Sequence, residues 1–242
     1  AFVGPEFGIV AEANGAAYRL SGSASMVTAA TEADLLVVAA VDAAGEPLLF
    51  CLDAEGIARE ATPALGFRAS GPGIVNLQDQ EVSGDSLVAQ GADASAALER
   101  AALAACIGGG AIAVGMARSS YDLTLRYGRQ RQAFGKALFD QQAVRHKLVC
   151  ALRGAQAPRH MVYHAARLAD RGEDASAAAM LAKLEAVAAA QLAADEGIQI
   201  HGGYGVSEEY EVGRLLLEAK ADIHAVHPET ESTAFHCSCF HN

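Results

Sequence analysis

The chain has 242 residues, of which 52% are hydrophobic and 19% are charged, a composition typical of a folded globular protein with a sizeable core. Its formal net charge is −11, and an acidic protein without a basic patch is a poor candidate for binding nucleic acid or an anionic membrane, so we expect neither as a partner. No apolar run approaches the roughly 20 residues needed to span a bilayer, and we expect no membrane segment.

The cellular setting is expected to be the cytoplasm. The first ten residues, AFVGPEFGIV, lack the basic region and the apolar core of a signal peptide. The five cysteines are scattered and show no disulfide or zinc framework. This pattern is typical of proteins in a reducing compartment.

Residues 1–92 hold short apolar or alternating runs, which predict β-strands. Turn compositions such as AAGEP and DAEG separate the runs, and no helical pattern lies between them. This order favours an antiparallel sheet or a small barrel over βαβ units. The clearest predicted strands are YRLSG, ADLLVVAAVD, PLLFCLD and GIVNLQDQEV.

Residues 93–242 are rich in alanine and leucine, and alanine is the best helix former. Long amphipathic helices with short connectors predict a four-helix bundle, so the expected fold class is α+β with domains 1–92 and 93–242. The predicted helices span residues 94–127, 141–170, 174–200 and 208–221. In the third, the apolar face is predicted to consist of Met180, Leu184, Val187 and Leu192.

The first stretch with chemical potential is YGRQRQAFGKALFDQQAVRHKL, residues 127–148. A short basic loop joins two predicted helices there. Arg129 and Arg131, together with free backbone amides at a helix start, suit a phosphate or pyrophosphate. A solvated basic turn accounts for the same residues.

The second stretch is IQIHGGYGVSEEYEVGRLLLEAK, residues 198–220. Gly202, Gly203 and Gly205 follow a helix and allow a backbone to approach a flat ligand or a neighbouring chain closely. A helix C-cap followed by a turn is the alternative interpretation.

Taken together, the two stretches resemble the acyl-CoA dehydrogenase family. RQAFGK, residues 131–136, is similar to the start of the signature R-x-x-F-G-K-P-L-x-x-F-Q-A-V. Residues 198–214 resemble L-Q-I-L-G-G-Y-G-Y-T-x-E-Y-P-V-x-R without a gap. YRLSGSASMVTAATEADLLVV resembles that family's Y-x-L-N-G-x-K-x-W-I-T-N-G-x-x-A-D-L-x-V-V. The likeness extends over nearly the whole chain.

This resemblance implies a β-domain followed by a helical domain, bound FAD, and dimers that pair into tetramers. The flavin would lie between the two domains, and its tail would cross to another subunit. Thr28 matches the threonine that faces the flavin ring. The residues implied to contact the FAD tail of a neighbouring chain are Arg131, Phe134, Gln142, Gln199, Gly202 and Gly203.

The sequence departs from the family at its beginning, because the family has a helical domain before the β-domain and this sequence starts at the β-domain. A partner chain would then supply that part, or the sequence is a fragment, or the pocket differs. Met26 stands where the family has a tryptophan near the flavin, and Leu217 replaces an arginine.

The catalytic base is a second departure. The family uses a carboxylate to remove the α-proton of an acyl-CoA thioester. Counting without a gap places Val226 at the usual position and Ala105 at a second known one. Glu99 matches neither register, and Glu229 is three residues late. Glu229 would serve only if the loop is longer, and an exposed carboxylate near the chain end is the simpler interpretation.

Other potentially reactive groups lie near the C-terminus. His224 and His227 would need further ligands placed in space to hold a metal. The tail FHCSCFHN has no recognised zinc spacing and is interpreted as a flexible tail, so we expect no metal site.

The sequence therefore predicts the FAD-binding subunit of an acyl-CoA dehydrogenase-like flavoprotein that acts on acyl-CoA. QAVRHKL, residues 142–148, resembles the branch in which unlike subunits often pair. A second chain would supply the base, and an electron-transfer flavoprotein would take the electrons. Two alternatives are a self-sufficient dehydrogenase that uses Glu229 and a non-catalytic assembly module without flavin. A metal-dependent hydrolase is a more distant alternative.

Overall fold

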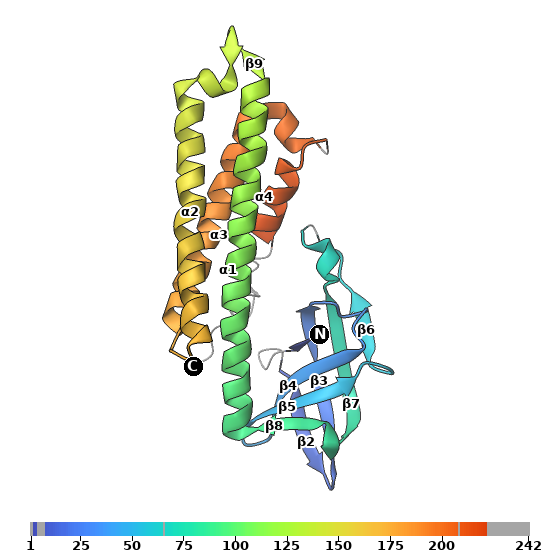
Figure 1. Cartoon of the computed structure of the whole chain (residues 1–242). Coiled ribbons are helices and arrows are strands. Elements are labelled where there is room, and N and C mark those ends of the chain that lie inside the picture. The colour runs from blue at the N-terminus through green and yellow to red at the C-terminus, as the bar shows by residue number, and fades with distance from the viewer. Residues whose placement is uncertain (1, 4–7, 65, 208, 222–242) are drawn as a thin grey trace. The chain divides into compact units, whose positions relative to one another are not determined.

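The computed structural model describes residues 2–3, 8–64, 66–207 and 209–221. The chain forms two compact units, and the boundary between them lies after Ala102. This boundary is inside α1, the longest described helix (Figure 1). The sequence-based domain boundary after residue 92 stays a prediction. The first unit contains β1 (Phe2–Val3), β2 (Val10–Asn14), β3 (Ala17–Val27), β4 (Leu35–Val41), β5 (Pro47–Asp53), β6 (Ala58–Ala61), η2 (Arg68–Ser70), β7 (Gly73–Ser83), η3 (Gly84–Ser86), β8 (Leu87–Gln90) and the start of α1 (Gly91–Gln130).

The second unit is helical (Figure 1). After the remainder of α1 it contains β9 (Gln132–Ala133), β10 (Lys136–Ala137), η4 (Leu138–Asp140), α2 (Gln142–Asp170), α3 (Ser176–His201), η5 (Gly202–Val206) and α4 (Val212–Ala221). The α+β class and the bundle of long helices predicted from the sequence are confirmed.

The strands of the first unit form one eight-stranded sheet in the order β6-β7-β3-β2-β4-β5-β8, with β1 added to β4. Most neighbours are antiparallel, as predicted, but β1 and β2 each pair with β4 in parallel, so the sheet is mixed. In β4, Leu36, Val38 and Ala40 belong to the core, and Ala39 on the other face of the strand is buried as well. Among the described residues, Phe50 of β5 is the largest wholly buried side chain, and the Tyr18 ring lies edge-on to it with centroids 5.2 Å apart.

A hydrogen-bonded turn follows β3 at residues 28–33. The pairing of β3 with β7 is irregular between Ala24 and Val27, and Met26 has a φ of +57°. The Ala29 amide donates to the carbonyl of Ser70 at 2.7 Å. Arg59 donates from Nη1 to the carbonyls of residues 30 and 33, at 3.0 and 2.8 Å. A backbone hydrogen bond and the Arg59 side chain thus hold the turn from two sides.

Successive helices of the second unit run in opposite directions because their connections are short (Figure 1). As a result, the end of α1, the start of α2 and the end of α3 lie at the same end of the bundle (Figure 1). Lys147 of α2 and Glu196 of α3 form an ion pair between these two helices.

The buried face of α3 differs from the predicted one. Alanines form most of that face, including Ala179, Ala182, Ala186 and Ala190, because small side chains let neighbouring helices approach closely. Of the predicted apolar face, only Val187 is buried. The larger leucines lie on the outward side, with exposed fractions of 56% for Leu181, 50% for Leu184 and 43% for Leu192.

The crossing of α1, α3 and α4 depends on one glycine. The Ser120 hydroxyl of α1 donates to the carbonyl of Ala193 at 2.8 Å, and Thr124 donates to the carbonyl of Ser120 at 2.7 Å. A Cβ atom on Gly197 would lie 2.6 Å from Val212 Cγ2 and 2.9 Å from Thr124 Oγ1. Glycine at this position therefore permits a contact that no larger residue allows without movement.

In the part of the chain that the structure describes, two helices have the length and composition of membrane spans, which corrects the expectation that no apolar run approaches that length. The richest 18-residue windows of α1 and of residues 176–206 have mean hydropathies of 1.5 and 1.4. Of these windows, 28% and 50% are buried in the structure. The core helices of soluble proteins meet the same criteria, and the absence of a membrane partner stays a prediction.

Candidate functional site

A tight hairpin projects from the end of α1. The Arg131 amide donates to the Tyr127 carbonyl at 2.9 Å, and the Leu138 amide donates to the Arg131 carbonyl at the same distance. At its tip, Phe134 and Gly135 have φ angles of +54° and +80°. A left-handed conformation is costly for a bulky residue such as phenylalanine, and this side chain is 95% exposed. The hairpin thus presents, at its tip, a strained residue with an almost fully exposed aromatic ring.

The glycine-rich turn at the end of α3 is open to the outside. Gly202 has a φ of +61°, and its amide donates to the carbonyl of Ile198. Gly203 has no positive φ, and a Cβ atom on either glycine would meet nothing within 4 Å. The left-handed turn thus explains glycine at 202. At 203, neither the backbone angle nor the surrounding packing requires it.

Tyr204 joins the hairpin to this turn. The guanidinium of Arg131 lies over the Tyr204 ring, 5.9 Å from its centroid, although the two residues are 73 positions apart in sequence. Gln142 at the start of α2 and Gln199 in the last turn of α3 are exposed at the same end of the bundle. The structure thus brings the two sequence stretches together on one exposed surface.

An aromatic cluster, formed by Tyr127, His201, Tyr204 and Tyr210, reaches from the exposed Tyr204 on that surface to the buried His201. The rings of Tyr127 and His201 are stacked with centroids 4.1 Å apart and planes inclined by 22°. Tyr210 packs edge-on against Tyr127 at 5.7 Å and is 5.4 Å from Tyr204. Arg126, Gln130, Arg131 and Glu211 join the cluster around a cavity of about 360 Å³.

His201 is the buried titratable group of the cluster, with an exposed fraction of 4%. Its Nδ1 lies 2.7 Å from the Gly197 carbonyl, which only accepts hydrogen bonds, so Nδ1 carries the proton. Burial lowers the pKa of the imidazole below its usual value, and the hydrogen bond to Gly197 opposes part of that effect. His201 is therefore neutral at pH 7.

The lowered pKa of His201 predicts a loss of stability in acid. The unfolded chain, with the ordinary histidine pKa of 6.5, binds this proton more readily than the folded chain. Stability is therefore full above pH 6.5 and decreases as the pH falls towards the lower folded pKa. The free energy of unfolding can be measured with urea between about pH 7.5 and 5.5. We expect His201→Phe to remove the part of its pH dependence that comes from His201, a slope of at most about 1.4 kcal/mol per pH unit. The exposed His160→Phe is the control, and an identical slope in wild type and His201→Phe would contradict the assignment.

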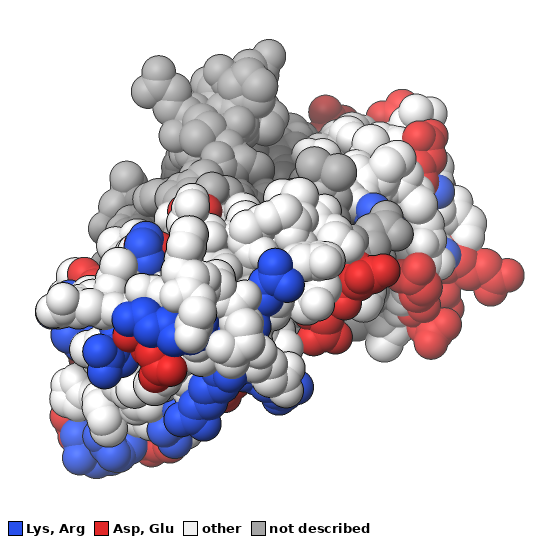
Figure 2. All heavy atoms as spheres, turned by 90° about the horizontal axis from the view of Figure 1, so that it is seen from above, with Lys and Arg blue, Asp and Glu red and all other residues white. Residues whose placement is uncertain are grey.

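Positive charge collects at this end of the bundle even though the chain is acidic overall. Residues 126–147 include six lysines and arginines against a single acidic residue, Asp140. Figure 2 looks down on the molecule from above and shows Lys and Arg side chains gathered on one part of the surface. The guanidinium of Arg129 lies 5.4 Å from the centroid of the Phe139 ring. Such an exposed cationic surface attracts an anion, and its arginine forks match phosphate oxygens.

These residues fit the anionic tail of a dinucleotide cofactor. Arg131 supplies an exposed fork of donors, and the open side of Gly203 allows a ligand to reach the backbone. Thr28 belongs to the other unit, where it is exposed in the turn after β3. Its part in flavin binding stays a prediction, as do those of Phe134 and Gln142.

The predicted catalytic candidate, Glu229, lies outside the described residues, as do Val226, His224 and His227. Ala105 lies in α1 and Glu99 is exposed near the start of that helix. Within the ranges that the structure describes, no group of three or more His, Cys, Asp or Glu side chains is placed to hold a metal ion.

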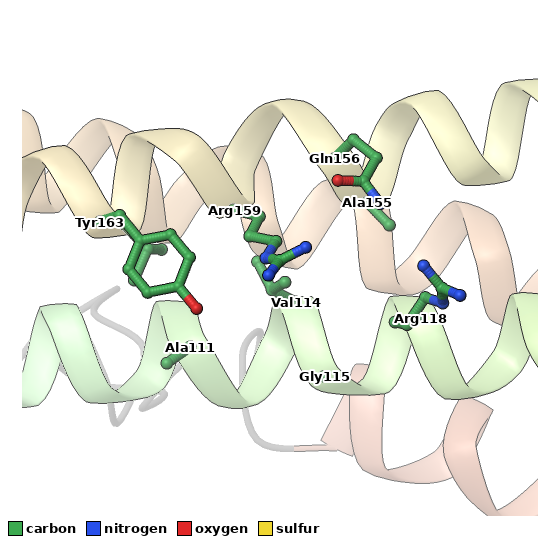
Figure 3. A pocket seen from close by; sticks show the side chains of 9 residues that line it. Ala111, Val114, Gly115, Arg118, Ala155, Gln156, Arg159 and Tyr163 are labelled. Atoms are coloured by element: carbon green, nitrogen blue, oxygen red, sulfur yellow. The ribbon is translucent and has the colours of Figure 1, made fainter.

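A second cavity, of about 260 Å³, lies between α1 and α2 (Figure 3). Its floor is apolar, and its arginines already have partners. Arg118 pairs with Asp122 at 2.8 Å, and Arg159 lies over the Tyr163 ring at 5.6 Å. We interpret it as a hollow left by small side chains, and it is lined by Ala111, Val114, Gly115, Arg118, Ala155, Gln156, Arg159, Val162 and Tyr163.

Sequence reasoning identified the hairpin and the glycine turn but missed the aromatic cluster. Tyr127 and Tyr210 each lie within a stretch singled out from the sequence, yet nothing in the sequence indicates that they meet at His201. The clustering of arginines at 126, 129 and 131 was the available signal for the cationic end.

Comparison with known proteins extends the resemblance. The chain is 30% identical to a probable acyl-CoA dehydrogenase of Bacillus subtilis over 86% of its own length and 57% of that protein's. The butyryl-CoA dehydrogenase structure from Megasphaera elsdenii matches with a TM-score of 0.83 and 28% identity, over 92% of this chain and 61% of that one. The ChsE4–ChsE5 complex from Mycobacterium tuberculosis matches with a TM-score of 0.79 and 25% identity, over 88% of this chain and 57% of that one.

The chain thus spans about three fifths of the length of these proteins. Residues 92–223, more than half of the chain, match the family described as acyl-CoA dehydrogenase, C-terminal domain. This match covers the hairpin, the glycine turn and the aromatic cluster. The chain belongs to the acyl-CoA dehydrogenase family.

Proposed function

We propose that this chain is an FAD-binding component of an acyl-CoA dehydrogenase-like flavoprotein. The cationic end of its helical unit would bind the diphosphate tail of an FAD molecule held with a neighbouring chain. The contact between Arg131 and Tyr204 carries the proposal, because it unites the hairpin with the open glycine turn on one exposed surface.

Each residue of this surface has a distinct role in the proposal. Arg131 would hold phosphate oxygens through two parallel hydrogen bonds. The open backbone at Gly203 would admit the ligand closely, and the exposed amides of Gln142 and Gln199 would bind polar groups of the tail. Phe134 at the hairpin tip would cover an apolar part of the ligand. FAD, when bound, supplies the acceptor for the hydride that leaves the β-carbon of the acyl-CoA.

The base that removes the α-proton is proposed to come from a second acyl-CoA dehydrogenase-like chain. Alanine and valine stand at the two positions where the family resemblance places the base, Ala105 and Val226. The outward leucines at 181, 184 and 192 offer an apolar surface for another chain. A heteromeric complex, ChsE4–ChsE5, is among the structural neighbours. We further propose a tetrameric assembly that passes its electrons to an electron-transfer flavoprotein.

Titration of the full chain with FAD and, separately, with FMN tests the role of the tail. FMN carries the same flavin ring but lacks the adenylate portion, so it is the matched control ligand. We expect FAD to bind, with an affinity that decreases as salt is added, because exposed charges are screened. We expect FMN to bind at least about tenfold more weakly, because it would lose at least one hydrogen bond to a charged group. Equal binding of both ligands, or of neither, would contradict the proposal.

A further inference from the structure

His201 connects the two halves of the proposed tail site. It is the last residue of α3, and Gly202 directly follows it in the left-handed turn. Its Nδ1 donates to the Gly197 carbonyl one turn earlier, which fixes the ring relative to the helix end. The ring is therefore held directly beside the start of the glycine turn.

Tyr127 holds the same residue from α1 in two ways. Its ring is stacked on the imidazole at 4.1 Å, and its hydroxyl donates to the backbone carbonyl of His201 at 3.3 Å. The backbone carbonyl of Tyr127 also accepts a hydrogen bond from the Arg131 amide at 2.9 Å. The backbone of Arg131 is thus hydrogen-bonded to Tyr127, the residue on which His201 is stacked.

A second path of contacts connects His201 to the side chain of Arg131. The His201 ring meets the edge of Tyr210 at 5.6 Å, and Tyr210 is 5.4 Å from Tyr204. Tyr204 in turn lies beneath the Arg131 guanidinium. Arg131 is therefore joined to His201 both through its backbone and through its side chain.

We propose that His201 is a positioning residue, which holds Arg131 and the Gly202–Gly203 turn in the one arrangement that binds the cofactor tail. The inference rests on the proposed function. His201 is buried and is not proposed to touch the cofactor itself. Misplacement of a binding group by about 1 Å is enough to lower binding or catalysis substantially, by up to about a hundredfold in enzymes.

The charge on the ring matters because of its surroundings. The other ionisable groups around the cavity are Arg126, Arg131, Glu211 and the three tyrosines of the cluster. Protonation of His201 would add a third positive charge beside Arg126 and Arg131, while Glu211 supplies the one negative charge. It would also place that charge in a stacked, buried ring. A charged ring is disfavoured in this buried stack, and we expect the resulting loss of positioning to outweigh the added attraction for the anionic tail, so that FAD affinity decreases in acid through His201.

The test is FAD titration of the full chain and four variants. His201→Leu keeps apolar volume but removes the ring and its hydrogen bond, and we expect about tenfold weaker binding. His201→Asn keeps a donor near the Nδ1 position and is expected to recover part of that loss. Tyr127→Phe removes only the hydroxyl contact and gives an independent, smaller loss even if His201→Leu does not fold. His160→Leu, an exposed histidine of α2, should bind as wild type does.

The pH profile separates positioning from a loss of folding. Wild-type affinity should decrease between about pH 7 and 5, and that of His201→Asn should stay level, since asparagine does not titrate. Folded His201→Leu and Tyr127→Phe variants that bind FAD as wild type does would overturn the positioning role and leave the proposed function intact. A wild-type chain that binds no FAD would overturn both.

Discussion

Replacing Arg131 with glutamine is expected to lower the affinity for FAD by about ten- to a hundredfold. The side chain is exposed and lies over Tyr204 on the cationic end of the bundle. A hydrogen bond to a charged group contributes about 1.5–3 kcal/mol, and each 1.4 kcal/mol is tenfold in affinity. Glutamine keeps a polar side chain of similar reach but lacks the charge and the forked donors. Isothermal titration calorimetry at low salt measures the change directly.

Arg153→Gln is the matched control for Arg131. Arg153 is an exposed arginine of α2 outside the cationic stretch of residues 126–147. Its replacement changes the net charge by the same amount, so any general electrostatic effect appears in both variants. Equal affinities in the Arg131 and Arg153 variants would show that the hairpin does not recognise the tail.

The second large effect is expected at Gly197, where alanine should destabilise the helical unit by about 1–3 kcal/mol, the usual cost of overpacking a core. The added Cβ atom would be 2.6 Å from Val212 Cγ2 and 3.0 Å from the Ser120 hydroxyl oxygen. Relief requires α3 to move away from both α4 and α1, and the movement away from α1 would weaken the hydrogen bond from Ser120 to Ala193. Urea unfolding followed by helical circular dichroism measures this loss.

Gly115→Ala provides the comparison on the same bundle. Gly115 lies inside α1, and a Cβ atom there would meet nothing within 4 Å. Alanine should therefore stabilise the helix by about 0.5–1 kcal/mol. If both variants were equally stable, close packing at Gly197 would have no part in the fold.

The helices were predictable from the sequence because their alanine content and length favour them regardless of their neighbours. The inward face of α3 was not, because hydrophobic periodicity gives most weight to large side chains. The predicted face relied on Leu184 and Leu192, whereas the contact with neighbouring helices uses alanines. Burial here follows the closeness of helix packing, which sequence periodicity does not encode.

The sheet was predictable in its longer strands and not in its short ones. β6 and β8 have only four residues each, too few to establish an alternating pattern. The parallel pairing of β1 with β4 depends on where the chain start lies in space, and no local signal in the sequence specifies it.

The candidate site was recognised through motifs, and its geometry came from tertiary contacts. Arg131 and Gly203 were predicted from the family resemblance. The stack of Tyr127 on His201 joins segments 74 residues apart, and it required the antiparallel arrangement of α1 and α2 with α3 returning beside them. Sequence spacing alone indicates which residues share a helix face and says little about which helices meet.

The central claim is that this chain binds FAD as part of a larger flavoprotein with another chain. Purification of the full chain from cells that also produce its partners tests it most directly, with the flavin absorbance and the protein composition of the eluate measured together. We predict a coloured complex that contains FAD and a second acyl-CoA dehydrogenase-like chain. A colourless chain that elutes alone, and stays colourless when FAD is added, would contradict the claim.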